Sequence, residues 1–288
     1  MTLATERGSA ASGPPADQIK VVPVAHPLRW AAVVITAVLV AMVFSGAIGN
    51  PRFQWTVVAD YMLDPIILNG LLVTLQLTVI AMALGIGLGV VLAFMRLSHS
   101  RFLVTVSWSY TWLFRSVPPL VQILFWYNLS ALYPRLSLGI PFGPELVSGS
   151  ANTLITAMTA AILGLGLNQA AYTSEVVRGG MLSVGHGQSE AALSLGMTEG
   201  QRLFRIVLPQ AMRAIIPPVG NEVIGMLKST SLVSVIALAD VLYSAQIIYS
   251  RTYQIVPLLL VACLWYLIGT SILSFGQYYI ERHFSRGT

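Results

Sequence analysis

The chain has 288 residues, of which 56% are hydrophobic and only 9% are charged, and its mean hydropathy is +0.75. This composition is far more apolar than that of a soluble domain and indicates a polytopic membrane protein. A formal net charge of +5 would suggest nucleic acid binding in a soluble protein, but most of the basic residues stand in short loops between apolar runs. We therefore expect an all-α transmembrane helix bundle that contacts membrane lipid and binds no nucleic acid.

The first 49 residues divide into a tail and an apolar run. Residues 1–29 are rich in Ala, Pro, Ser and Gly, with few large apolar groups, and predict a disordered cytoplasmic tail. Residues 30–49 form an apolar run of 20 residues, which at about 1.5 Å per residue crosses a hydrocarbon layer of roughly 30 Å. The small residues at 45–47 leave a signal peptide as the alternative, but the length of the run favours an uncleaved N-terminal transmembrane helix.

Longer apolar stretches follow a polar linker and predict five further spans. The linker covers residues 50–65, and the spans cover residues 66–95, 102–133, 151–177, 211–241 and 256–280. The stretch at 102–133 is too long for one straight span, so we expect Pro118 and Pro119 to bend it. Gly85 and Gly89 form a G-x-x-x-G pair, which favours close helix packing over a phosphate cradle because it lies in a membrane segment.

The basic residues predict the orientation of the spans. With the amino terminus inside and the spans alternating, eleven of the 16 Lys and Arg residues fall inside and three outside, while Arg115 and Lys228 fall within spans. This bias places both termini in the cytoplasm and the loop at residues 134–150 outside. It also places residues 178–210 in the cytoplasm. We call this polar segment between the fourth and fifth spans the island.

Two short helices are predicted within the island. Ser189 is a candidate cap for the first helix, and Gly196 supplies a left-handed turn that closes it. Thr198 and Gln201 form a capping box for the second helix, which Pro209 is expected to end. Each helix has a small or apolar face, made of Ala191, Ala192 and Leu195 on the first and of Leu203, Phe204 and Val207 on the second. Such a hairpin either lies at the membrane interface or docks to a partner.

The spacing within the island resembles a known motif. The residues that carry it are Glu190, Ala191, Ala192, Gly196, Ile206, Leu208 and Pro209. Their order and spacing resemble the cytoplasmic coupling signature of permease subunits of ATP-binding cassette (ABC) importers. Further stretches narrow the resemblance to the polar amino acid (His/Glu/Gln/Arg/opine) uptake family, namely residues 68–75, 114–122, 168–175 and 208–232. The resemblance covers residues 66–282, which would form the permease transmembrane domain.

This resemblance implies a type I importer permease of the bacterial cytoplasmic (inner) membrane. The segment from Glu190 to Gly196 would seat in a groove of a separate ABC ATPase subunit. The other implied partners are an extracytoplasmic substrate-binding protein and a second permease, either an identical copy or a paralogue. Similar proteins commonly need only five spans, so the tail and the first span are an addition here.

No catalytic motif is found in the sequence. A P-loop is absent, because Lys228-Ser229 follows Leu227 where the motif requires glycine. There is likewise no G-x-S-x-G elbow and no H-E-x-x-H zinc site, and the four histidines show no ligand spacing. We therefore expect a transporter subunit that is not an enzyme and carries no cofactor or metal, with ATP and Mg bound by the partner ATPase.

Charged residues within spans are the first candidates for a substrate pathway, because a Lys or Arg at the bilayer centre costs about 2.5–3.5 kcal/mol on insertion scales. Lys228 either lies beside the substrate or forms a salt bridge to Glu222 or a neighbouring carboxylate that ties the bundle together. Arg115 either lines the pathway or extends to the membrane interface near Pro118.

Polar residues within spans complete the set of pathway candidates. Asn168, Tyr172 and Glu175 stand three or four apart and share a helical face, which either lines a polar seam or holds helices together. The segments that carry the resemblance add Gln122 and Ser229. Many relatives have Asp or Asn where Ser229 stands, so a cationic amino acid is less favoured as cargo but is not excluded.

Two alternatives to an amino acid importer remain open from the sequence. One is a secondary transporter or channel that works without ATP, which would need no docking island. The other keeps the ABC permease and changes the cargo to another small polar solute, such as an opine or an amino acid derivative.

Overall fold

The computed structural model describes residues 27–139 and 145–285. The chain forms two compact units, residues 1–53 and residues 54–288. Most of the tail expected at residues 1–29 lies outside the described residues.

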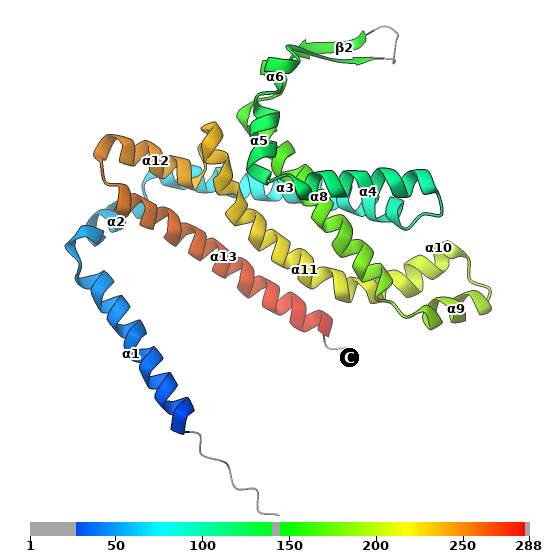
Figure 1. Ribbon diagram of the computed structural model, residues 1–288, viewed down its shortest axis with the longest axis horizontal. Helices are drawn as coiled ribbons and strands as arrows, with labels where there is room; N and C mark the ends of the chain where they lie inside the picture. Colours follow the sequence, from blue (N-terminus) through cyan, green and yellow to red (C-terminus); the bar gives the residue numbers. More distant parts are fainter. Residues whose placement is uncertain (1–26, 140–144, 286–288) are drawn as a thin grey trace, which may run out of the picture. The chain divides into compact units, whose positions relative to one another are not determined.

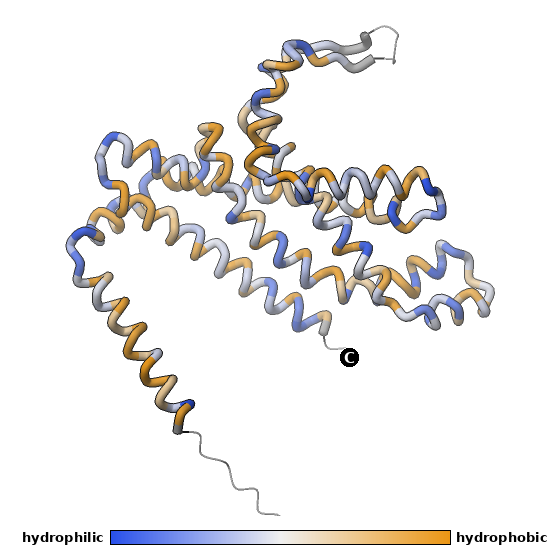
Figure 2. The backbone as a smooth tube through the Cα atoms, viewed as in Figure 1, coloured by the Kyte–Doolittle hydropathy of each residue, from blue (hydrophilic) through white to orange (hydrophobic). Residues whose placement is uncertain are grey.

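A single long helix dominates the first unit. Helix α1 covers Pro27–Gly49, and a short 3₁₀ helix, η2, covers Pro51–Phe53. Nearly every side chain of α1 is exposed within its unit, and Figure 2 shows apolar residues along its whole length. A helix that is apolar all round requires lipid or another protein around it. The predicted apolar helix at 30–49 is therefore present, and it begins three residues earlier than expected.

Helices make up almost all of the second unit (Figure 1). From its start to the island its elements are α2 (Trp55–Met62), α3 (Pro65–Arg96), α4 (Arg101–Ser116), α5 (Pro119–Tyr127), α6 (Leu129–Leu132), β1 (Arg135–Gly139), β2 (Glu145–Ser150), α7 (Ala151–Leu154) and α8 (Ala157–Leu182). The island and the last helices are α9 (His186–Ser194), α10 (Glu199–Arg202), the π-helix η3 (Leu203–Val207), α11 (Leu208–Ser229), the 3₁₀ helix η4 (Thr230–Ile236), α12 (Val241–Thr252) and α13 (Ile255–Ser285).

Helix α8 lies at the centre of this unit, where it contacts α3, α4, α5 and α11. Its contact with α3 is close because glycines of α3 face it. A Cβ added to Gly85 would lie 2.6 Å from Cγ of Gln169, and one added to Gly89 would lie 2.8 Å from Cβ of Thr173. The G-x-x-x-G pair therefore serves helix packing, as predicted.

Several predicted boundaries are wrong. The linker at 50–65 is largely helical, since it holds η2 and α2, and the predicted loop at 134–150 contains the antiparallel strands β1 and β2. Residues 140–144 of that loop lie outside the described residues. The fourth span is divided into α7 and α8, because Thr156 has extended backbone angles and caps α8 through a hydrogen bond from the Thr159 N–H.

The fifth predicted span is also divided. Helix α11 ends at Ser229, η4 follows, and Ala237 adopts a left-handed conformation with a φ of 57° before α12 begins. The Asp240 carboxylate caps α12 by accepting a hydrogen bond from the Tyr243 N–H at 2.8 Å. A second hydrogen bond from the Tyr266 hydroxyl, also at 2.8 Å, ties this break to α13.

Length and hydropathy alone identify fewer spans than the six expected. Among the described residues three helices qualify, α1, α3 and α13, and a fourth span is gained if the bent pair around Ala237 counts as one. The prolines divide α4 from α5, as predicted, so neither helix is long enough by itself. Helix α8 is long enough but carries many polar side chains. The predicted all-α transmembrane bundle is confirmed.

Candidate functional site

Helix α9 is the first helix that lies wholly within the island, and the chain turns sharply at Gly196 after it. Gly185 precedes α9 without a side-chain cap, so the predicted cap at Ser189 is wrong, because that residue already lies in the helix. Gly196 has a φ of +76°, as predicted for the left-handed turn, and no atom lies within 4 Å of where its Cβ would be. The Thr198–Gln201 capping box is present, with both of its hydrogen bonds formed.

The second half of the island runs directly into α11. Pro209 was expected to end a helix, and this prediction is wrong, because Pro209 lies in the first turn of α11. An N–H in the first turn needs no intrahelical partner, so proline is tolerated there. The π-helix η3 joins α10 to α11 and so makes one continuous helical path from the island into the bundle.

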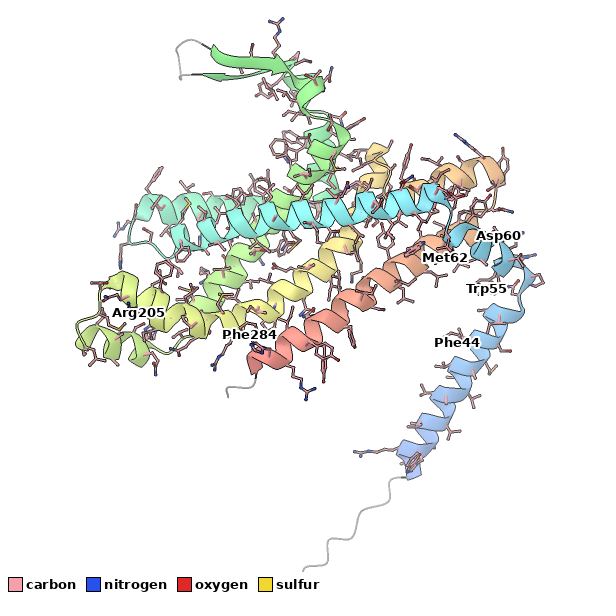
Figure 3. All side chains as sticks on the ribbon, turned by 180° about the vertical axis from the view of Figure 1, so that it is seen from behind. Phe44, Trp55, Asp60, Met62, Arg205 and Phe284 are labelled. Atoms are coloured by element: carbon pink, nitrogen blue, oxygen red, sulfur yellow. The ribbon has the colours of Figure 1, made fainter. Side chains whose placement is uncertain are left out.

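The apolar faces of the island are only partly covered by the rest of the unit. Ala192 and Val207 are buried, whereas Leu195 is 84% exposed and Phe204 is 66% exposed. Arg205, on the same segment, is also exposed and is labelled in Figure 3. The other residues of the motif differ in burial: Glu190, Ala191 and Pro209 are exposed, and Ile206 and Leu208 are half-buried. The island therefore presents large apolar side chains that the described residues leave uncovered.

Lys228 does not form the salt bridge that was one of its two possible roles. Among the described residues the ion pairs are Arg178–Glu175 and Arg202–Glu199. Glu222 instead accepts a hydrogen bond from the Thr173 hydroxyl of α8 at 2.8 Å and so joins α11 to α8.

The Lys228 side chain is exposed on α11, and it lies on a polar stripe that we call the Lys228 stripe. Asn221 is exposed at one end of this stripe, Gly225 follows at i+4, and Lys228 follows at i+7. No atom lies within 4 Å of a Cβ built on Gly225. The Ser229 hydroxyl donates to the Gly225 carbonyl at 3.0 Å and so bonds within its own helix. Within a bilayer such a charged side chain requires protein or water against it, because lipid would leave the ammonium group unsolvated.

Gln122 and Asn168 hold the broken end of α4. The Asn168 amide donates to the Phe114 carbonyl at 2.7 Å, and the Gln122 amide donates to the Phe114 and Val117 carbonyls, both at 2.8 Å. These carbonyls lack helical partners because the chain breaks at Pro118. Of the two possible roles of Asn168, the geometry supports helix packing.

Arg115, Tyr172 and Glu175 meet in a pocket of about 350 Å³ between α4 and α8. The Arg115 guanidinium carbon lies 5.1 Å from the centre of the Tyr172 ring, within the range of a cation–π contact. Glu175 accepts hydrogen bonds from Arg178 at 2.7 and 2.9 Å. The geometry therefore supports the interpretation that Tyr172 and Glu175 of α8 line a polar seam.

Five further residues of this pocket were not predicted: Arg96, Trp108, Thr111, Trp112 and Ser116. Trp108 and Trp112 precede Arg115 by seven and three residues, so helical spacing places all three on one face of α4. That spacing was available in the sequence as a signal. Arg96 carried no such signal, because it lies at the end of α3 and is brought to the pocket only by the packing of helices.

No cluster of three or more His, Cys, Asp or Glu side chains that could hold a metal occurs within residues 27–139 and 145–285.

The chain is similar to known membrane proteins over most of its length. The family described as "binding-protein-dependent transport system inner membrane component" matches residues 85–286. The arginine transport system permease protein ArgU of Corynebacterium glutamicum is 43% identical over 98% of this chain and 88% of its own length. The nopaline transport system permease protein NocM of Agrobacterium fabrum is 38% identical, covering 73% of this chain and 84% of its own.

Solved structures agree with this similarity. A crystal structure of an amino acid ABC transporter with histidines contains a chain that is 35% identical, with a TM-score of 0.65, covering 76% of this chain and 94% of that one. A chain of the inward-facing MetNI methionine ABC transporter is only 18% identical, with a TM-score of 0.56, and supports the fold alone. The chain therefore belongs to the inner membrane components of binding-protein-dependent transport systems, the permease subunits of ABC importers.

Proposed function

We propose that this chain is the permease subunit of an importer for polar amino acids or close derivatives, driven by separate ATPase subunits. The cargo class is supported by the relatives, which are named for arginine, nopaline, octopine and glutamate/aspartate transport. The importer class is supported by one observation above all, the exposed apolar surface of the island.

The island has the properties of a docking element. Leu195 and Phe204 are among the most exposed large apolar side chains of the second unit. Burying each in a partner's groove would contribute about 1.5–3 kcal/mol. Gly196 between them has no side chain and turns the chain back on itself, so a groove can enclose the turn closely. The partner with this groove would be a separate ATPase subunit, which would bind ATP and Mg. The island would be the surface of this chain that the motion of the ATPase displaces.

Force applied to the island would reach the membrane bundle through a continuous helical path. Helix α10, η3 and α11 follow one another without an intervening loop, and Val207 is packed in the cluster that includes Val177 and Ile215. A displacement at α9 and α10 is therefore transmitted to α8 and α11. Movement of paired bundles against each other is a known form of alternating access.

The Lys228 stripe is the proposed substrate pathway, with Ser229 and Glu222 beside it. A second permease, identical or paralogous, would cover this face of α11 and so shield Lys228 from lipid. The pathway would then lie between the two permeases.

The positive-inside bias supports an orientation with both termini and the island in the cytoplasm. The strands β1 and β2 would then face an extracytoplasmic binding protein.

Helix α1 would be an additional membrane helix. The similarity to ArgU covers 98% of this chain, whereas that to NocM covers 73%, which supports the view that the N-terminal segment is shared by only some relatives.

The proposed docking role can be tested by placing a charge in the turn. In proteoliposomes that contain the ATPase and binding protein, Gly196→Asp should abolish stimulation of ATP hydrolysis by the loaded binding protein, because Asp adds charge and bulk where the groove closes. Gly200→Asp is the matched control: Gly200 is also exposed on the island with open space around it, but its φ is not positive. The measurement is the ratio of stimulated to basal ATPase rate. Unchanged stimulation in Gly196→Asp would contradict the docking role.

A further inference from the structure

The pocket between α4 and α8 has features that the coupling role of the island does not explain. Its volume of about 350 Å³ lies in the range of small-molecule sites. One wall is the face of α4 that carries Trp108, Trp112 and Arg115, and the other is the face of α8 that carries Tyr172 and Glu175. The Lys228 stripe lies on α11 and contributes nothing to the lining.

Positive charge predominates in the pocket. The lining contains two guanidinium groups, of Arg96 and Arg115, and one carboxylate, of Glu175. The Nη1 atom of Arg96 is buried and has no hydrogen-bond partner within the described residues. A buried donor without a partner costs about 1–3 kcal/mol, and more when it is charged. Because Arg96 lines the pocket, its guanidinium group attracts an anionic group there, although Nη1 itself is enclosed by protein.

The single carboxylate is held in a way that leaves room for a cation. Both hydrogen bonds from Arg178 end on the same oxygen of Glu175, Oε2, so Oε1 is not engaged by Arg178. A ligand that carried only negative charge would be repelled by this carboxylate. A ligand with an anionic group for the guanidiniums and an ammonium group for Glu175 satisfies both.

Aromatic rings form the apolar wall. The rings of Trp108 and Trp112 are stacked, with centroids 6.3 Å apart and planes at 11°. Each Trp is at least half exposed, at 50% and 59%, so each presents a ring surface to the pocket side of α4. Such a wall accommodates the carbon chain of a ligand whose charged end is held by the guanidiniums.

We infer that this pocket is a second cargo site that binds the zwitterionic head of an α-amino acid. The carboxylate would be received by the guanidiniums of Arg96 and Arg115, which suit carboxylates because they can donate two parallel hydrogen bonds. The ammonium group would lie at Glu175. This inference rests on the proposed amino acid cargo and adds a site separate from the Lys228 stripe.

The tryptophan pair makes direct binding measurable. The purified chain is placed in nanodiscs of phosphatidylglycerol and titrated with L-arginine, L-glutamine and L-glutamate, each beside its α-amide. At least one amino acid should give a saturable change in tryptophan fluorescence, and its amide should bind at least about tenfold more weakly because it lacks the carboxylate. Trp108→Phe with Trp112→Phe should remove most of the change.

Arginine variants then locate the site. Arg96→Gln and Arg115→Gln should each raise the apparent Kd at least about tenfold. Arg101→Gln is the matched control, because Arg101 is exposed at the first turn of α4 and does not line the pocket. Size-exclusion profiles check that the variants fold. The comparison of acid with amide needs no variant and so tests the inference even if a variant fails to fold.

Several results would overturn this inference. The first three are equal binding of acid and amide, titrations unchanged by both arginine substitutions, and no fluorescence change with any of the three amino acids. The fourth is a change that appears only when phosphatidylethanolamine is added to the nanodiscs, because the headgroup of this lipid also pairs an anion with an ammonium group. Uptake by the reconstituted wild-type importer separates this failure from a wider one. If uptake of an amino acid persists, only the second site is wrong. If no amino acid is taken up, the proposed function itself is wrong.

Discussion

At the scale of the single residue, a substitution of Lys228 can distinguish a role in transport from a structural role. Its side chain is exposed and forms no ion pair with the described residues, so removing it leaves no buried partner unsatisfied. Replacing a lysine at membrane depth by an apolar residue lowers the cost of insertion by about 2.5–3.5 kcal/mol. A purely structural role for Lys228 therefore predicts unchanged or improved assembly with unchanged uptake.

We expect Lys228→Met to reduce amino acid uptake about tenfold or more while the amount of assembled importer stays the same. Methionine keeps the length of the apolar stem and removes the charge, and Lys228→Arg restores the charge as the matched control. The measurements are initial uptake rates in proteoliposomes and the yield of the co-purified complex. Normal uptake by Lys228→Met would remove Lys228 from the pathway.

At the scale of the element, the contact between α3 and α8 depends on two glycines of α3 that face α8, Gly85 and Gly89. Gly87, which lies between them, has no such contact. A Cβ on Gly85 would lie 2.6 and 2.7 Å from side-chain atoms of Gln169, whereas none lies within 4 Å of a Cβ on Gly87. We expect Gly85→Leu to separate the helices and to lower the melting temperature of the detergent-solubilised chain by several degrees, since overpacking costs about 1–3 kcal/mol. Gly87→Leu should melt as the wild type does. Equal melting temperatures for the two variants would contradict this packing.

The same elements show what the sequence could and could not predict. The apolar run at residues 66–95 predicted α3, a glycine predicted the turn at Gly196, and the pair Thr198 and Gln201 predicted the capping box, because each signal lies within one short stretch of sequence. The divided fifth span was missed, although Asp240 before an apolar segment is a possible helix cap. The apolar character of residues 211–241 favoured a single unbroken span, so this signal was not used. The position of Arg96 in the pocket depends on the packing of three helices, which no local pattern records.

At the scale of the whole molecule, the topology depends on whether α8 crosses the membrane. Its composition does not qualify it as a span, yet its 26 residues would extend about 39 Å, enough for a hydrocarbon layer of roughly 30 Å. Many of its polar side chains, such as Thr173 and Ser174, are buried against neighbouring helices. Burial within the protein makes polar groups compatible with a membrane helix, because their hydrogen bonds are satisfied there and not by lipid.

The position of α8 can be tested with single cysteines on either side of it. Cys263 is the only cysteine of the chain, so Cys263→Ser gives a background for single-cysteine variants. Ser148→Cys then marks the strands before α8 and Ser194→Cys marks the island after it, and both serines are exposed. If α8 crosses the membrane, a membrane-impermeant maleimide should label the Ser148→Cys variant only in right-side-out vesicles and the Ser194→Cys variant only in inside-out vesicles. Labelling of both variants from the same side would show that α8 returns without crossing, and the island and the strands would then face the same compartment.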